Sequence, residues 1–128
     1  MNPVGQCPLP VSTERGDTVV VLPLEVDTCN ASLIGAQLLA LLDEGVPSLI
    51  MDMTSTRFCD CAGLQAIVRA GRRADALSTP ACVALPAAGP VRRVAHLADL
   101  ARRAPVTTGV AAAHRRLHQA TPAYDSVS

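Results

Sequence analysis

Short apolar runs alternate with amphipathic segments along most of this chain, and this alternation limits the possible folds more than any other feature. The apolar runs are typical of buried strands, and the segments between them repeat apolar residues at helical spacing. Strands are predicted at residues 18–22, 48–53, 82–85 and 105–107, and helices at residues 32–44, 63–77, 90–98 and 110–117. Such alternation predicts an α/β fold with a largely parallel sheet and right-handed crossovers.

A further strand is expected before Gly16, because residues 11–15 and 18–22 flank a Gly16-Asp17 pair that suits a hairpin turn. The sheet would then be mixed but mainly parallel, with about four to five strands and about four helices. The 128 residues fit a single domain with one core. Three segments are expected: a flexible lead-in at residues 1–9, the domain at 10–119 and a flexible tail at 120–128.

The charge balance and hydropathy of the chain exclude some classes of function. Eleven basic and eleven acidic residues give a formal charge of zero, which argues against a direct nucleic-acid-binding surface. No apolar run approaches the ~20 residues that span a bilayer, and the N-terminus lacks a signal-peptide pattern. The protein is therefore expected in the cytoplasm without membrane contact, and there its five cysteines would be reduced.

Motifs of common enzymes are absent: the chain has neither a glycine-rich phosphate loop nor a Gly-x-Ser-x-Gly element. His114 and His118 are four residues apart, as two metal ligands on a helix would be, but cations near a helix C-terminus are the ordinary explanation. Cys59 and Cys61 are too close for an unstrained disulfide, and Cys59 is expected as a small buried apolar residue. A zinc site would need Cys29 or Cys82 from other loops. The sequence thus predicts no catalytic residue, metal or cofactor.

The segment Phe58–Leu64 joins a strand-and-loop region to the helix predicted at 63–77, and it is the expected functional centre. Cys61 is expected at the N-cap of that helix or just before it. A helix N-terminus presents unpaired N–H groups and a positive dipole end, which favour an anion, a phosphorylated side chain or a thiolate. Asp60 opposes further negative charge at this place.

Residues 52–64 (Asp-Met-Thr-Ser-Thr-Arg-Phe-Cys-Asp-Cys-Ala-Gly-Leu) resemble the central D-L-S-x-x-x-F-x-D-S-[ST]-G-L motif of STAS domains, in particular of bacterial anti-sigma factor antagonists. Leu24–Asp27 is similar to an early G-E-L-D element of that family, with leucine in place of the glycine. Gly89–Val94 is similar to its S-P-A-V-R-R-V helix start. The likeness covers roughly residues 10–119 and implies a single STAS-type domain.

This resemblance implies regulation of transcription by partner switching. Members of the group bind an anti-sigma factor, often a GHKL-type serine kinase, and so release a sigma factor. The kinase phosphorylates the first serine after the motif aspartate, and the added charge blocks binding. In this chain Cys61 occupies the phosphoacceptor position and Ala62 follows it, so neither residue offers a hydroxyl.

The expected partner interface centres on the start of the helix at 63–77. Loops at the same ends of parallel strands cluster on one rim, so neighbouring loops are expected to contribute. The candidate binding and switch residues are Asp60, Cys61, Ala62 and Gly63, with Asp27 and Asn30 beside them. Residues 87–89, Arg92 and Arg93 are expected on the same rim.

Three hypotheses fit these residues. The first is a non-phosphorylatable antagonist, a monomer or weak dimer that always remains able to bind its anti-sigma partner. The second is a thiol or redox switch at Cys61. The third is a scaffold subunit of a larger signalling assembly, or a diverged module with a small-ligand site. A duplicated copy that folds but no longer switches is the remaining alternative, and none of these makes the protein an enzyme.

Overall fold

Strands and helices follow one another in the alternating order that the sequence predicts. The computed structural model describes residues 9–127, with side chains described for residues 9–119. The elements are β1 (Val11–Glu14), β2 (Asp17–Val21), β3 (Glu25–Val26), α1 (Ala31–Asp43), β4 (Leu49–Asp52), β5 (Phe58–Cys59), α2 (Cys61–Ala76), β6 (Ala81–Leu85), α3 (Pro90–Leu97), the 3₁₀ turn η1 (Leu100–Arg102), β7 (Val106–Thr108) and α4 (Val110–Val127).

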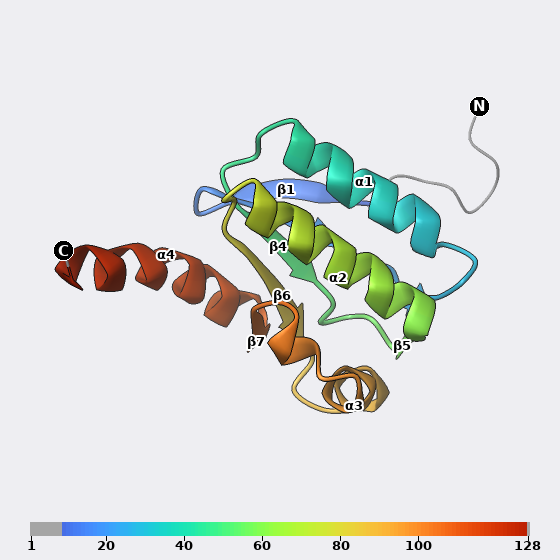
Figure 1. The fold of residues 1–128 in the computed structure, drawn as a ribbon. Coiled ribbons are helices and arrows are strands. Elements are labelled where there is room, and N and C mark those ends of the chain that lie inside the picture. The colour runs from blue at the N-terminus through green and yellow to red at the C-terminus, as the bar shows by residue number, and fades with distance from the viewer. Residues whose placement is uncertain (1–8, 128) are drawn as a thin grey trace.

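Five strands form one sheet in the order β1-β2-β4-β6-β7 (Figure 1). β1 pairs with β2 antiparallel, and every other neighbouring pair in this sheet is parallel. The short strands β3 and β5 pair with each other in a separate parallel ribbon. The predicted α/β fold with a mixed, mainly parallel sheet is therefore confirmed.

Helices cover both faces of this sheet. Side chains alternate between the faces along each strand, so Val20 and its paired neighbour Met51 both point into the larger core. α1 and α2 lie side by side over that face (Figure 1). Val19 and Ile50 point to the opposite face, where Ala113 of α4 packs against them. The loops of the candidate site follow the carboxyl ends of β2 and β4.

The β1–β2 hairpin turns one residue earlier than expected. Glu14 pairs with Asp17, so the turn consists of Arg15 and Gly16 and not of the Gly16-Asp17 pair. Both turn residues have positive φ, 53° and 84°, as the favoured type I′ hairpin turn requires. Because the strand pairing extends to Asp17, this residue belongs to β2 and its side chain is buried.

Hydrogen bonds and helical structure extend into both segments that the sequence predicts as a lead-in and a tail. The backbone N–H of Leu9 donates to Gln37 Oε1 at 2.8 Å, and its carbonyl accepts from Gln37 Nε2 at 3.1 Å, so the lead-in is anchored at this residue. Residues 1–8 lie outside the described part of the chain. α4 is assigned to Val127, through residues expected as a tail. No described helix is both long and apolar enough to span a bilayer.

Candidate partner-binding site

The loop between β5 and α2 carries the residues that the sequence places at the functional centre. Asp60 is the N-cap of α2, and its Oδ1 accepts a hydrogen bond from the N–H of Gly63 at 2.9 Å. This bond satisfies one of the N–H groups that a helix start leaves unpaired. Cys61 is therefore the first residue of the helix, and the prediction that it lies at or before the N-cap is wrong because Asp60 performs the capping.

The second oxygen of Asp60 connects this loop to the loop between β3 and α1. Asp60 Oδ2 accepts from the backbone N–H of Thr28 at 3.2 Å and from its hydroxyl at 3.3 Å. The bond from Gly63 is the main cause of a lowered pKa for Asp60; partial burial opposes it, and the bonds from Thr28 add to it. Asp60 is thus a fixed negative charge that holds two loops together.

Asp27 and Asn30 shape the second of these loops from within. Asn30 Oδ1 accepts from the N–H of Asp27 at 2.9 Å, and Asn30 Nδ2 donates to the carbonyl of Glu25 at 2.7 Å. Asp27 Oδ1 accepts from the N–H of Cys29 at 2.9 Å. Asn30 occupies the N-cap position of α1, but its side chain makes no capping bond to that helix. The Thr28–Asp60 bonds place this loop next to the start of α2, as the sequence analysis expected of loops on one rim.

Gly63 allows the first turn of α2 to lie directly against β3. A Cβ at this position would lie 2.6 Å from both Cγ1 and the carbonyl oxygen of Val26, and 3.0 Å from Cys59 Sγ. Real Cβ atoms do not approach backbone oxygens so closely, so only glycine fits without a shift of the strand or the helix. The glycine of the motif is therefore explained by a close approach of two elements.

The two motif thiols lie in different surroundings. Cys59 is 2% exposed, and its pKa is raised to about 11, chiefly by burial and further by the negative charge of Asp60. It is the small buried apolar residue that the sequence predicts. Cys61 is exposed at the first helical position, and Ala62 beside it is half-buried. Cys61 is thus the motif thiol that solvent or a partner can reach.

Two exposed apolar side chains lie on β5 and on the segment just before β3, and neither was predicted as a surface residue. The N–H groups of Arg57 and Phe58 donate to the carbonyl of Leu24 at 2.7 and 3.1 Å, which brings the two segments together. Phe58 is 48% exposed and Leu24 is 56% exposed. The sequence did contain a signal for Phe58. It is the only phenylalanine of a chain that is poor in aromatic residues, and it lies within the motif.

The start of α3 supplies the third part of the expected rim. Residues 87–89 are exposed, and α3 packs against β5 (Figure 1). Arg92 is half-buried and its Nη1 donates to the carbonyl of Pro86 at 3.0 Å, so this guanidinium braces its own loop. Arg93 is exposed. Of the two arginines expected to supply charge at the rim, Arg93 is therefore the one whose side chain is more available to a partner.

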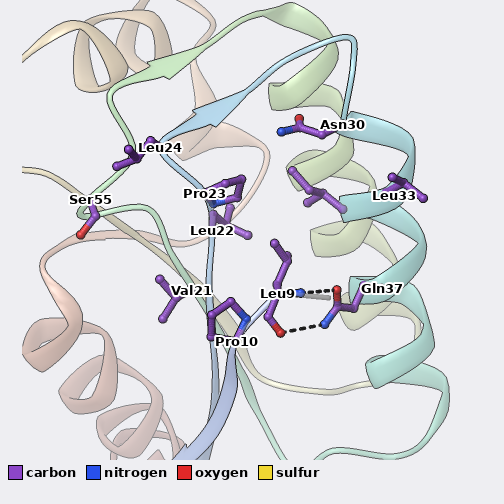
Figure 2. A pocket seen from close by; sticks show the side chains of 11 residues that line it. Leu9, Pro10, Val21, Leu22, Pro23, Leu24, Asn30, Leu33, Gln37 and Ser55 are labelled. Atoms are coloured by element: carbon purple, nitrogen blue, oxygen red, sulfur yellow. Dashed lines mark hydrogen bonds between the residues drawn. The ribbon is translucent and has the colours of Figure 1, made fainter. Parts of the chain in front are cut away.

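An apolar pocket lies next to the rim, between the segment that follows β2 and helix α1 (Figure 2). Its volume is about 440 Å³, and its walls are mostly aliphatic, with polar groups from Asn30, Gln37 and Ser55. Leu24 and Leu33 are its most exposed apolar residues. The size is within the usual range of small-ligand pockets, so this is where a small ligand would enter if the domain bound one.

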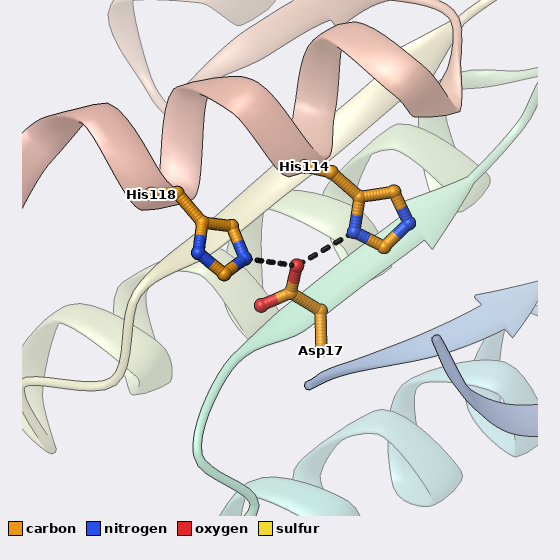
Figure 3. Close-up of side chains that lie close together, drawn as sticks. All are labelled: Asp17, His114 and His118. Atoms are coloured by element: carbon orange, nitrogen blue, oxygen red, sulfur yellow. Dashed lines mark hydrogen bonds and ion pairs between the residues drawn. The ribbon is translucent and has the colours of Figure 1, made fainter. Parts of the chain in front are cut away.

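His114 and His118 share a face of α4, as predicted, and both side chains point to Asp17 of β2 (Figure 3). The expectation that they lie near a helix C-terminus is wrong, because α4 begins at Val110 and continues far beyond them. Their contact with a carboxylate about a hundred residues earlier in the chain was not foreseen. This cluster lies at the amino end of β2, away from the loops described above.

The sequence and the fold were compared with known proteins. Residues 9–113 match the model of the STAS domain family. The chain belongs to the STAS domain family. No curated protein sequence matches it. The motif loop of this STAS domain is therefore the β5–α2 junction, with Asp60, Cys61 and Gly63 at its centre.

Solved structures with the same fold include named regulators. An anti-sigma factor antagonist from Mycobacterium paratuberculosis is 21% identical, with 90% of this chain and 97% of that chain covered and a TM-score of 0.74. RsbS from Moorella thermoacetica is 14% identical, covering 89% and 97%, with a TM-score of 0.71. The phosphorylated form of the Bacillus cell fate determinant SpoIIAA is 20% identical, covering 84% and 97%, with a TM-score of 0.60. At these identities the likeness establishes the fold alone.

Proposed function

We propose that this STAS domain is an anti-sigma factor antagonist whose binding is not switched by serine phosphorylation. One observation carries the proposal: the motif geometry is complete around Asp60 and Gly63, yet the exposed first residue of α2 is Cys61. A serine at that position would receive a phosphate at the positive end of the helix, where the charge changes binding most strongly. Cys61 and Ala62 offer a kinase no hydroxyl.

Hydroxyl groups elsewhere in the motif are poor substitutes. Thr54 Oγ1 donates to Asp52 Oδ1 at 2.6 Å, and the buried Thr56 donates its hydroxyl to the carbonyl of Pro23 at 2.8 Å. Thr28 uses its hydroxyl to bond Asp60. Ser55 is exposed, but it precedes the helix by several residues and lies outside its positive end. Phosphate at any of these sites would not reproduce the switch.

The proposed partner surface has an apolar centre and a charged border. Leu24 and Phe58 supply adjacent exposed apolar side chains, and Glu25 and Asp60 supply acidic groups beside them. Interfaces commonly place an aromatic anchor in such a setting, with a polar rim around it. The partner we propose is an anti-sigma factor, including kinases of the GHKL type.

The decisive experiment measures binding of the purified protein to the anti-sigma factors of its own genome, with and without ATP. Wild type should bind one of them, take up no phosphate and stay bound, whereas Cys61→Ser should be phosphorylated by a kinase partner and released. Phe58→Ala should weaken binding at least about tenfold. The matched control is Leu77→Ala, because Leu77 is 41% exposed at the far end of α2. Phosphate on wild type, or equal losses in both alanine variants, would contradict the proposal.

The exposure of the thiols favours a second candidate function, an antagonist controlled by oxidation of Cys61. Cys29 is also exposed and follows Thr28, which is bonded to Asp60, the residue before Cys61. Oxidised glutathione should then abolish partner binding by wild type and leave Cys61→Ser unaffected. If oxidation changes neither protein, the constitutive antagonist remains.

The proposal also concerns location and assembly. A protein that regulates sigma factors through an anti-sigma factor works in the cytoplasm, and we expect a monomer or weak dimer there. Light scattering on the eluate of a size-exclusion column measures the mass directly, against the 13.3 kDa of the chain. A large defined assembly would instead favour the scaffold hypothesis.

A further inference from the structure

The side chains of Asp17, His114 and His118 converge at one point between β2 and α4 (Figure 3). Asp17 Oδ2 lies 2.6 Å from His114 Nδ1 and 3.1 Å from His118 Nε2. The Asp17 and His114 side chains are each 5% exposed, whereas His118 is 59% exposed. A carboxylate buried in this way needs positive or proton-donating partners, and two imidazoles from one helix supply them.

These three side chains also offer ligand atoms of the kind that bind a metal ion, and the atoms lie close enough for small side-chain movements to bring them around one. All of them lie within 4.8 Å of one another, and no other group of His, Cys, Asp or Glu atoms converges in this way in the described part of the chain. Zinc binds imidazole nitrogen and carboxylate oxygen at about 2.0–2.2 Å, so neighbouring ligand atoms around a tetrahedral ion are about 3.4 Å apart. His118 already has nearly this distance from Asp17, and His114 would have to retreat by less than about 1 Å.

Outer partners hold the potential ligands in place, as they do in metal sites generally. The Ser48 hydroxyl donates to Asp17 Oδ1 at 2.6 Å, which leaves Oδ2 for an ion. The second ring nitrogen of His114, Nε2, faces the Glu14 carboxylate at 4.0 Å. A metal at Nδ1 would displace the proton that His114 now directs at Asp17, and Nε2, which faces Glu14, would carry the ring proton instead.

An entry path exists on the side of His118. A shallow hollow of about 270 Å³ is lined by Arg15, His114, Arg115 and His118. We propose that Asp17, His114 and His118 bind a divalent transition-metal ion of the zinc type, with water or a small anion in the fourth position facing Arg15 and Arg115. Three protein ligands with one open position form a common arrangement for zinc. The arginines, which repel a bare cation, would stabilise an anion bound to it.

The ion would join the β1–β2 hairpin to α4 at the amino end of β2. The residues proposed for partner binding lie beyond the carboxyl ends of the strands, so this inference does not depend on the proposed function. The expected role is to stabilise the attachment of α4, because a metal that binds only the folded state stabilises that state by mass action.

The experiment titrates the full chain with Co²⁺, followed by its visible absorption, and with Zn²⁺, followed by calorimetry. Wild type should bind one ion per chain, without the charge-transfer band of a thiolate–cobalt bond. His118→Ala should lower the affinity at least about 100-fold, because loss of a ligand exceeds the 10–100-fold cost of losing an outer partner. His96→Ala is the matched control, since His96 is an exposed histidine on α3, and it should bind as wild type does.

One further variant and one further measurement complete the test. A protein with Cys7, Cys29 and Cys61 changed to serine should bind as tightly as wild type, and Zn²⁺ should raise the melting temperature of wild type and His96→Ala but not of His118→Ala. Equal affinity in wild type and His118→Ala would overturn the proposal. So would loss of binding only in the serine variant, or absence of binding by wild type at submillimolar Zn²⁺.

Discussion

Gly63 is the residue at which the packing of the motif loop is tightest. The contact with Val26 involves a backbone carbonyl as well as a side chain, so β3 cannot yield by a change of rotamer alone. Gly35 in α1 is different, because a Cβ there would meet only the Ala66 Cβ, at an ordinary 3.7 Å. The two glycines therefore form a natural pair for a test.

We expect Gly63→Ala to lower the free energy of unfolding by about 1–3 kcal/mol through overpacking. Gly35→Ala should be neutral or stabilising by about 0.5–1 kcal/mol, because alanine is the better helix former. Urea unfolding followed by circular dichroism measures both. Equal effects in the two variants would contradict the close approach of α2 to β3.

Reactivity of the thiols is a second residue-scale prediction. At pH 8, iodoacetamide should modify Cys29 and Cys61 in the folded protein and leave Cys59 and Cys82 unmodified. Burial raises the pKa of Cys59 to about 11 and also raises that of Cys82, so both remain neutral and enclosed. Mass spectrometry of peptides gives the order of labelling, and in urea all five cysteines of the chain should react. Early labelling of Cys59 would show that the motif loop opens.

At the scale of elements, Asp60 connects the start of α2 to the loop before α1. Reversing the charge of Asp60, one of the candidate binding residues, would therefore affect the fold as well as partner binding. Lysine would remove the N-cap bond to Gly63 and place a positive charge at the positive end of the helix.

We therefore expect Asp60→Lys to lower the melting temperature, and Asp60→Asn to lower it less, because asparagine retains the oxygen that accepts from Gly63. Differential scanning calorimetry on the two variants tests this order. Asp75→Asn is the control, an exposed carboxylate near the other end of α2. If Asp60→Lys melted as wild type does, the capping bond would contribute nothing to stability.

Periodicity predicted α1 and α2 well, but it missed the second half of α4 and the shortest strands. α1 and α2 lie within one or two residues of their predicted ranges, because each repeats apolar residues over several turns. β3 and β5 were not predicted, since two-residue strands are too short for any alternation to show. The hairpin turn was misplaced by one residue, because Gly-Asp fits a turn as well as Arg-Gly does unless the pairing of Asp17 is known.

At the scale of the whole molecule, the parts of the site that sequence could not reveal are contacts between distant residues. The motif identified Asp60, Cys61 and Gly63 because they are consecutive or nearly so. The bond from Thr28 to Asp60, and the approach of His114 to Asp17, join residues that are far apart in the chain. Only the order and register of the strands bring such residues together, and no local pattern encodes that order.

Stability of the whole domain is linked to pH through Asp17. Burial alone would raise the pKa of this carboxyl, but hydrogen bonds from Ser48, His114 and His118 outweigh it and hold the pKa below its usual range. A lowered folded-state pKa contributes stability that is fully present above the unfolded-state value of ~3.9. This contribution is lost as the pH falls through the lower, folded-state pKa.

We expect Asp17→Asn to be less stable than wild type at pH 7 by about 1–3 kcal/mol, and the difference to shrink below pH ~4. Urea unfolding at several pH values, in the presence of a chelator, measures it. Asp43→Asn is the control, because the Asp43–Arg73 salt bridge is exposed and should contribute at most about 1 kcal/mol. A difference that does not change with pH would show that the Asp17 carboxylate is not ionised in the folded state.

The bond between Thr28 and Asp60 offers a way to follow partner binding by fluorescence. Because it ties the loop of Cys29 to the start of α2, we expect a partner that binds at the start of α2 to change the surroundings of Cys29 as well. With Cys7 and Cys61 changed to serine, Cys29 would be the one exposed thiol in the described part of the chain. An environment-sensitive dye attached to Cys29 would therefore change its fluorescence when a partner binds or dissociates. Thr28→Val, which removes the hydroxyl bond, should make this change smaller.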